Sequence, residues 1–185
     1  MKVKWGVIGA GGIARRRSIP EVIKFSEKSQ IVALMDISAD LVKETGKQFG
    51  IDQCYTKVEE ILKQDIDAVY IASRVFEHEK QVAAALNAGK HVLCEKPMAL
   101  TLDQTENMIA LAEKKNLKIG AAFMMRFNVY HQKIKQLVEE NQLGQIVYGR
   151  AQLTCWYPPI PGAWRQKKAT GGGGALIDMG CHCID

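Results

Sequence analysis

The stretch GVIGAGGIA, residues 6–14, decides the fold. It follows a short apolar run that is typical of a buried strand, and its glycines have the spacing Gly9-x-Gly11-x-x-Ala14. A glycine at the first position permits a tight turn, the second lets the backbone approach a pyrophosphate, and a small third residue lets the next helix pack closely on the strand. The stretch therefore predicts a dinucleotide-binding turn, whose expected contacts are Gly9, Gly11, Gly12, Ile13 and Ala14.

The next apolar run, residues 31–36, ends in Asp36. A carboxylate at the end of the second strand suits a ribose with two free hydroxyls and repels a 2′-phosphate, so the predicted cofactor is NAD. NADP stays possible, because the arginines at 15–17 could offer charge to a phosphate. The simpler interpretations are a turn without a ligand and an aspartate that caps the next helix, although Ser38 competes for that cap.

Strand-like and helix-like runs alternate through the first two thirds of the chain. Such alternation indicates a parallel sheet with helices on both faces, so the predicted fold class is α/β, with a Rossmann-type doubly wound sheet over residues 1–123. The strands are expected at 3–9, 31–36, 67–73, 90–95 and 118–123, and the helices at 38–50, at 77–89 and from Thr101 onward, where Thr101 and Gln104 have capping-box spacing.

The pattern changes after about Phe123. An amphipathic helix is expected at 128–141, and the alternating run QIVYGRAQLTCWY, residues 145–157, is typical of a half-buried antiparallel strand. A proline-rich loop and a glycine-entered helix follow. We interpret residues 124–185 as the first part of an α+β domain with a mostly antiparallel sheet.

Composition excludes several function classes. The net charge of +5 is not gathered into a basic arm or stripe, which argues against nucleic acid as a partner. No apolar run approaches the roughly 20 residues that a membrane span needs. The five cysteines are odd in number and lack Cys-x-x-Cys spacing, which indicates reduced thiols and a cytoplasmic location.

A second group of chemically active residues follows the strand at 90–95. Glu95, Lys96 and Pro97 lie at the carboxyl edge of the expected sheet, where ligands bind in doubly wound folds. Proline favours an extended backbone at Lys96, which can direct the lysine into the crevice, where an ammonium group can hold a substrate hydroxyl and help to move its proton. An exposed lysine in a turn is the simpler alternative.

Three motifs in this order, GAGGIA (9–14), AGKHVLCEKPMA (88–99) and GGGGALIDMGCHCID (171–185), resemble the glucose–fructose oxidoreductase and inositol dehydrogenase family, Gfo/Idh/MocA. The resemblance covers essentially the whole chain. It implies an NAD(P)-dependent dehydrogenase or reductase of sugars, polyols and related hydroxyl compounds. It also implies a second domain with a large antiparallel sheet that forms a homo-oligomer interface.

The resemblance implies roles for individual residues as well. Lys96 resembles the family's catalytic lysine, Asp178 the acid that positions the substrate, and His182 the acid/base. Glu95 and Lys96 match positions near the nicotinamide ribose. Further cofactor contacts are expected at Ser73 and His78, and further substrate contacts at Arg126, Trp164 and Arg165.

One segment departs from the family pattern. After the third main strand, members often read Thr-Pro-Asn followed by two residues and a histidine. Here His78 is kept, but Arg74 and Val75 stand in place of the proline and asparagine, so the usual cofactor contacts are in doubt at this point.

Asp178 and His182 also suggest a site without the resemblance. Residues four apart lie on one face of a helix, and a carboxylate with an imidazole can bind a hydroxyl and accept its proton. A surface ion pair or a satisfied buried histidine is the alternative. Cys181 and Cys183 lie two apart and point to different faces, so no metal site is expected.

Two other functions stay open at this point. One is a dinucleotide-binding module without turnover, or an inactive truncated dehydrogenase, since family members are longer than 185 residues. The other is redox-neutral chemistry through transient oxidation. Asp185 would place a negative charge where the helix dipole disfavours it, and we therefore expect the chain to be cut short just after the active-site helix.

Overall fold

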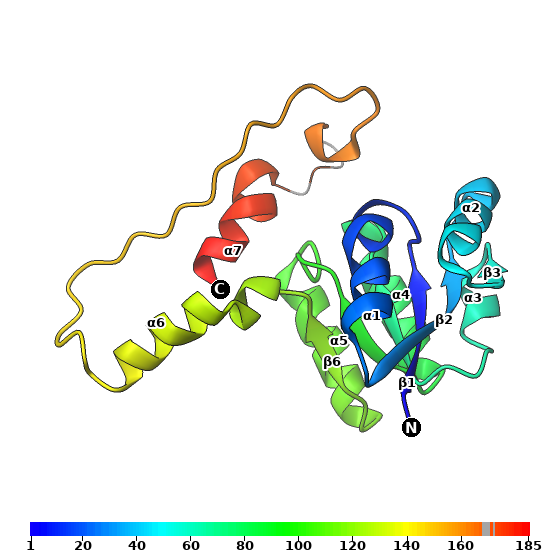
Figure 1. The fold of residues 1–185 in the computed structure, drawn as a ribbon, viewed down its shortest axis with the longest axis horizontal. Coiled ribbons are helices and arrows are strands. Elements are labelled where there is room, and N and C mark those ends of the chain that lie inside the picture. The colour runs from blue at the N-terminus through cyan, green and yellow to red at the C-terminus, as the bar shows by residue number, and fades with distance from the viewer. Residues whose placement is uncertain (168–170, 172) are drawn as a thin grey trace. The chain divides into compact units, whose positions relative to one another are not determined.

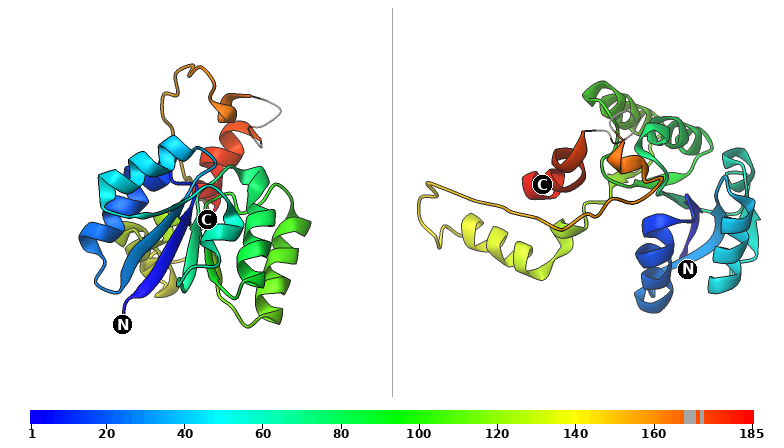
Figure 2. Two further views of the ribbon diagram at one scale, coloured as in Figure 1. Left: turned by 90° about the vertical axis from the view of Figure 1, so that its right-hand side faces the viewer. Right: turned by 90° about the horizontal axis from the view of Figure 1, so that it is seen from above.

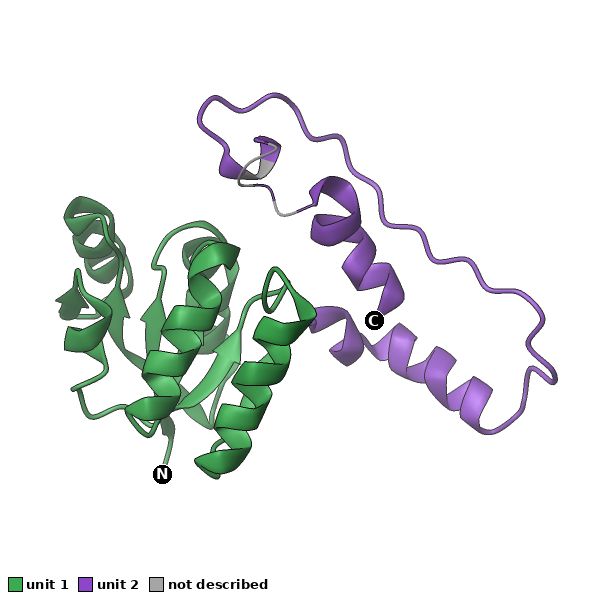
Figure 3. Cartoon of the chain, turned by 180° about the vertical axis from the view of Figure 1, so that it is seen from behind, with its two compact units in different colours: residues 1–121 green, residues 122–185 purple. Residues whose placement is uncertain are grey.

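A computed structural model describes residues 1–167, 171 and 173–185, without the side chain of Arg165. The chain divides into two compact units, Met1–Ala121 and Ala122–Asp185, which are coloured separately in Figure 3. Both the six-stranded sheet and the glycine-rich turn belong to the first unit.

The first unit is built on one parallel sheet with the strand order β3-β2-β1-β4-β5-β6. This order, with β1 beside β2 on one side and β4 on the other, is that of a doubly wound Rossmann sheet and confirms the predicted fold class. The strands are β1 Val3–Ile8, β2 Ser29–Met35, β3 Gln53–Tyr55, β4 Ala68–Ile71, β5 His91–Cys94 and β6 Ile119–Ala121.

Helices cover both faces of this sheet (Figure 1). In the left view of Figure 2, α1 and α2, in blue and cyan, lie on one side of the strands, and α4 and α5, in green, lie on the other. The helices are η1 Ala14–Ser18, α1 Ile19–Phe25, α2 Ala39–Phe49, α3 Val58–Ile61, α4 Val75–Asn87 and α5 Leu102–Lys114. Strands buried between two helical layers carry apolar side chains on both faces, which explains why Ala68–Ile71 is buried at every position.

Capping residues set the helix ends as the sequence predicts. The Ser38 side chain accepts a hydrogen bond from the Leu41 amide at the start of α2, and Gly50 ends that helix with a positive φ of 68°. Thr101 and Gln104 form the expected reciprocal capping box at the start of α5. Each cap satisfies backbone groups that a helix end leaves without an intrahelical partner.

Two short elements escaped the sequence analysis. The edge strand β3 and the one-turn helix α3 contain only three and four residues. Segments this short contain too few residues to establish an alternating or helical pattern. In addition, the helix after the glycine turn begins as the π-helix η1, just before Pro20, whose ring lacks the N–H that a continuous α-helix would use.

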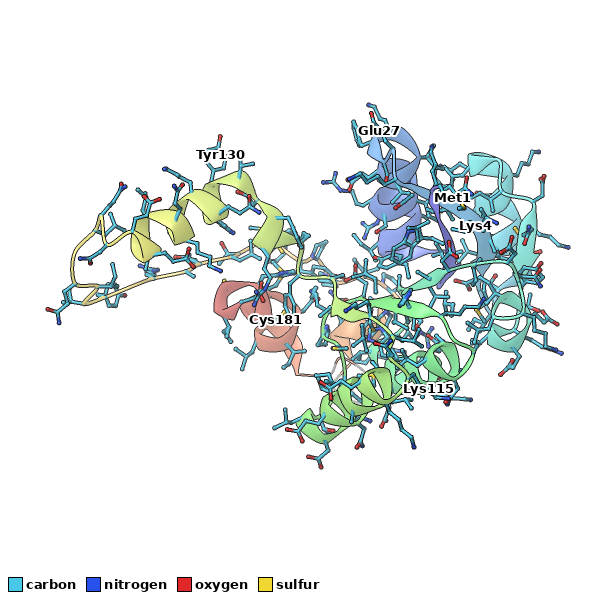
Figure 4. All side chains as sticks on the ribbon, turned by 90° about the horizontal axis from the view of Figure 1, so that it is seen from below. Met1, Lys4, Glu27, Lys115, Tyr130 and Cys181 are labelled. Carbon is cyan, nitrogen blue, oxygen red and sulfur yellow. The ribbon has the colours of Figure 1, made fainter. Side chains whose placement is uncertain are left out.

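The second unit contains η2 Met124–Phe127, α6 Val129–Glu139, η3 Trp164–Gln166, η4 Leu176–Gly180 and α7 Cys181–Ile184. The helices predicted at 128–141 and after the glycines are present, and Figure 4 shows the side chain of Tyr130 projecting from α6. The terminal helix begins as a π-helix and continues as α7.

The strand predicted at 145–157 is wrong. The segment has no strand or helix assignment and is exposed throughout. An alternating sequence forms a strand only where a neighbouring strand accepts its backbone hydrogen bonds, and the described part of residues 122–185 holds no such neighbour. The antiparallel sheet expected to begin in this unit is therefore not seen within the described residues.

Within the described ranges, no helix has both the length and the apolar character needed to cross a membrane.

Candidate active site

The glycine turn between β1 and η1 has backbone geometry that only glycine fits well. Gly9 has a φ of +91°, and a Cβ added there would lie 2.7 Å from the backbone of Ala72 and Ser73. Gly12 also has a positive φ, of 48°, but an added Cβ would meet no atom within 4 Å. The turn thus packs tightly against the loop that follows β4 and is open at Gly12, which leaves room for a phosphate beside bare backbone. These residues fit a dinucleotide.

Helix α2 holds this turn in place. The buried hydroxyl of Thr45 donates a 3.3 Å hydrogen bond to the carbonyl oxygen of Ala10. Arg15, on η1, pairs with Glu44 at 2.7 Å and donates to Gln48 at 2.8 Å. The same pairing lowers the pKa of the Glu44 carboxyl through its hydrogen bond and charge interaction with the guanidinium. The turn is therefore fixed by its neighbours before any ligand binds.

Asp36 lies directly after β2, as predicted, and is half-buried. Its Oδ1 accepts a 3.0 Å hydrogen bond from the Ser38 amide, while the Ser38 side chain caps α2. Ser38, and not Asp36, thus caps the helix. The hydrogen bond from the Ser38 amide orients the Asp36 carboxylate at the end of the strand. A fixed carboxylate at this place can accept hydrogen bonds from a ribose diol.

Glu95 and Lys96 follow β5 at the same edge of the sheet, and both are half-buried. Glu95 Oε1 accepts a 2.5 Å hydrogen bond from the Tyr70 hydroxyl, and Oε2 accepts one of 3.2 Å from the Lys96 amide. The Lys96–Pro97 peptide bond is cis. The glycine turn, Asp36 and the Glu-Lys-Pro turn thus share the carboxyl edge of one sheet, where doubly wound folds bind their ligands.

His78 supports the Glu-Lys-Pro turn from inside the protein. Its ring is 1% exposed, with Nδ1 3.0 Å from the Pro97 carbonyl oxygen and Nε2 3.3 Å from that of Ser73. The Ser73 hydroxyl in turn donates to Gln81 at 2.6 Å. The ring therefore contacts backbone on both sides, and its direct effect is to hold the two loops that follow β4 and β5.

The buried ring predicts a pH dependence of stability. Desolvation lowers the pKa of His78 below its ordinary value of 6.5, so the unfolded chain takes up the proton first as the pH falls. The contribution of His78 to the unfolding free energy should be complete above pH 6.5, the ordinary pKa of the imidazole, and should decrease as the pH falls below it. We expect the stability difference between wild type and His78→Gln, measured by urea unfolding at stepped pH, to shrink as the pH falls. A difference that is constant across this range would contradict the expectation.

In the second unit, Asp178 lies on η4 and His182 on α7, both half-buried. The ring of His182 packs edge-to-face on Phe123, with ring centroids 6.0 Å apart. Asp178 and His182 thus both lie in the terminal helix that the sequence predicts, and their place on one face of it stays a prediction.

The remaining predicted substrate contacts lie elsewhere in this unit. Trp164 begins η3, and the side chain of Arg165 lies outside the described residues. Arg126 Nε donates a 2.6 Å hydrogen bond to the side chain of Asp185, a partner that the sequence analysis did not anticipate.

Other residues that hold the site in place give only weak signals in the sequence. β-Sheet register brings Tyr70 to Glu95, and helix packing brings Thr45 to Ala10. Neither residue belongs to a short motif. Tyr70 is the one polar side chain in a buried strand, which is the only hint that the sequence offers. Within the described residues there is no cluster of three or more histidine, cysteine or acidic side chains that could hold a metal ion.

Comparison with known proteins places this geometry among oxidoreductases. The family model described as "Oxidoreductase family, NAD-binding Rossmann fold" matches residues 3–123, and the model of the "GFO/IDH/MocA C-terminal domain" matches residues 131–185. The chain is 32% identical to a 1,5-anhydro-D-fructose reductase of Ensifer adhaerens, over 98% of the chain and 54% of that protein. It is 31% identical to a trans-1,2-dihydrobenzene-1,2-diol dehydrogenase of Xenopus tropicalis, over its full length and 55% of that protein.

Comparison with solved structures also gives oxidoreductases. The scyllo-inositol dehydrogenase of Lactobacillus casei, solved with NAD(H) and scyllo-inositol, superposes with a TM-score of 0.73 at 28% identity and covers 78% of this chain and 43% of that one. A mutant 3-ketoreductase of Actinomadura kijaniata, solved with TDP-benzene and NADP, gives a TM-score of 0.80 at 28% identity, over 96% of this chain and 54% of that one. The chain spans about half the length of the curated relatives that it matches.

Proposed function

The chain belongs to the Gfo/Idh/MocA family of NAD-binding oxidoreductases, and from this premise we propose that the protein transfers a hydride between a nicotinamide cofactor and a hydroxyl or carbonyl group of a sugar or polyol. The observation that carries the proposal is the glycine turn, tight at Gly9 and open at Gly12, with the oriented carboxylate of Asp36 directly after the neighbouring strand β2. Both features suit a dinucleotide.

We assign cofactor binding to the carboxyl edge of the first unit. The glycine turn, with Ile13 and Ala14, would hold the pyrophosphate, and Asp36 the adenosine ribose. Glu95 and Lys96 would face the nicotinamide ribose, while Ser73 and His78 shape the loop beside them. When bound, the nicotinamide accepts or supplies the hydride.

The proton of the substrate hydroxyl needs a separate acceptor. In the oxidation direction the carbon–hydrogen bond of the substrate breaks with its electron pair, the hydroxyl loses its proton, and a carbonyl forms. We propose that Lys96 and His182 hold and move this proton and that Asp178 orients the substrate. Arg126, Trp164 and Arg165 are the proposed walls of the substrate pocket.

Two measurements test the function. Titration of the chain with NADH and NADPH, followed by cofactor fluorescence, tests binding at the glycine turn. A screen of sugars, inositols and diols with both cofactors tests turnover. Binding without any turnover in the screen would favour a dinucleotide-binding module over a dehydrogenase, and no binding of either cofactor would contradict the proposal.

Asp36 should set the cofactor preference. Replacing it with serine removes the repulsion of a 2′-phosphate together with the charged acceptor for the ribose diol. We expect Asp36→Ser to weaken NADH binding about tenfold and to raise the NADPH-to-NADH affinity ratio by about two orders of magnitude. Asp40→Ser, which removes the same charge from the first turn of α2, is the matched control and should leave the ratio near that of the wild type.

A further inference from the structure

We propose that Tyr70 is a positioning residue for the proposed hydride-transfer site, because its hydroxyl fixes the Glu95 carboxylate, which in turn fixes the backbone of Lys96. The inference rests on the proposed function only in its second part, which is the effect of Tyr70 on cofactor binding. The hydrogen-bond network itself lies wholly in the first unit and can be tested without a ligand.

Sheet register brings the two side chains together. β4 and β5 pair with Tyr70 beside Leu93 and Ile71 beside Cys94, and the Glu95 amide donates to the Ile71 carbonyl at 2.8 Å. Glu95 is therefore the first residue beyond the paired part of β5. The Tyr70 side chain, 7% exposed, places its hydroxyl 2.5 Å from Glu95 Oε1. A buried ring in a central strand has little freedom, so this contact is well defined.

The chemistry of the groups sets the direction of the hydrogen bonds. A carboxylate can only accept, so the Tyr70 hydroxyl donates to Glu95 and is left with a lone pair that accepts the 3.0 Å hydrogen bond from Ser18. Desolvation, and then the nearby Glu95 charge, raise the pKa of Tyr70 far above its ordinary value, so the phenol keeps its proton and stays a donor at any working pH.

The network connects the two halves of the proposed site. Ser18 is the last residue of η1, the helical segment that follows the glycine turn, and Glu95 precedes the lysine proposed to move the proton. With Oε1 held by Tyr70 and Oε2 accepting from the Lys96 amide at 3.2 Å, the carboxylate is fixed at both oxygens. Without the phenol hydroxyl, the carboxylate could rotate and the Lys96 amide would lose a fixed acceptor.

The first arm of the test measures amide hydrogen exchange in the chain without ligand. Tyr70→Phe keeps the buried ring and removes only the hydroxyl. We expect the Lys96 amide to exchange about tenfold faster, while the amides of β4 and β5 keep their wild-type rates. Tyr55→Phe, which removes the hydroxyl of a half-buried tyrosine in β3, is the matched control and should leave the Lys96 amide unchanged. Unaltered exchange at Lys96 in Tyr70→Phe, or equal acceleration throughout both strands, would overturn the inference.

The second arm measures NADH affinity in a double-mutant cycle. Tyr70→Phe should weaken NADH binding about fivefold to tenfold in the wild-type background, and less than about twofold in the Glu95→Gln background, because the hydroxyl acts through that carboxylate. Equal losses in both backgrounds would overturn the positioning role. Failure of the wild-type chain to bind NADH would instead refute the proposed function, while the exchange measurement would still decide the role of Tyr70.

Discussion

Replacing Gly9 with alanine should lower the unfolding free energy of the first unit by about 4 kcal/mol. Two costs combine at this position. The φ of +91° is one that a residue with a Cβ adopts only with strain, and the added methyl would lie 2.7 Å from backbone atoms of Ala72 and Ser73. Backbone held directly behind a buried strand cannot move aside as a flexible side chain can, so the turn itself must shift. Urea unfolding should reveal the loss, and NADH binding should weaken with it.

Gly50→Ala separates the two costs. Gly50 also has a positive φ, of 68°, but an added Cβ there would meet no atom within 4 Å. Its substitution carries the backbone cost alone, which we expect to be about 1 kcal/mol. Equal losses for the two variants would mean that the close approach to the loop after β4 contributes nothing, and would contradict the role that we give to the turn.

Where local chemistry determines the structure, the sequence was sufficient. Ser38, Gly50 and the Thr101–Gln104 pair set helix ends through contacts within a few residues, and each was found where its spacing predicts it. The same holds for the glycine turn, whose function depends on backbone geometry that few other sequences allow. The alternation of long elements then suffices to predict the doubly wound sheet.

Where structure depends on residues distant in the chain, the sequence pattern predicted a wrong element or none. The alternating run at 145–157 has the side-chain pattern of a strand, but a strand also needs a neighbour that accepts its hydrogen bonds, and a pattern of side chains carries no information about that neighbour. Edge strand β3 is the opposite case, since three residues pair with β2 without any pattern of their own.

The candidate site divides in the same way. The candidate site residues Asp36, Glu95 and Lys96 could be selected from motifs and strand ends. The groups that hold them could not, because Tyr70 reaches Glu95 across 25 positions and His78 reaches Pro97 across 19, through register and packing alone. Motifs thus select candidate reacting groups, and only the fold identifies the residues that orient them.

Substitution of Lys96 should have the largest effect on turnover. Lys96→Met keeps most of the length and apolar stem of the side chain and removes the ammonium group. If Lys96 moves the substrate proton, kcat should fall by about 10²–10⁴ on the sugar or polyol that the screen identifies, while NADH affinity changes by less than about fivefold. Steady-state rates from NADH absorbance, with cofactor affinity measured separately by fluorescence, distinguish a catalytic loss from a binding loss.

Lys96→Arg decides whether charge or proton transfer matters. Arginine retains the positive charge at this turn, but its guanidinium does not release a proton near neutral pH. A proton-transfer role predicts that Lys96→Arg is nearly as impaired as Lys96→Met. Recovery of most of the wild-type rate by arginine would instead assign the lysine an electrostatic role. Glu95 accepts a hydrogen bond from the Lys96 amide, which neither substitution removes, so both variants should keep the backbone of the turn and their difference should report on the side chain.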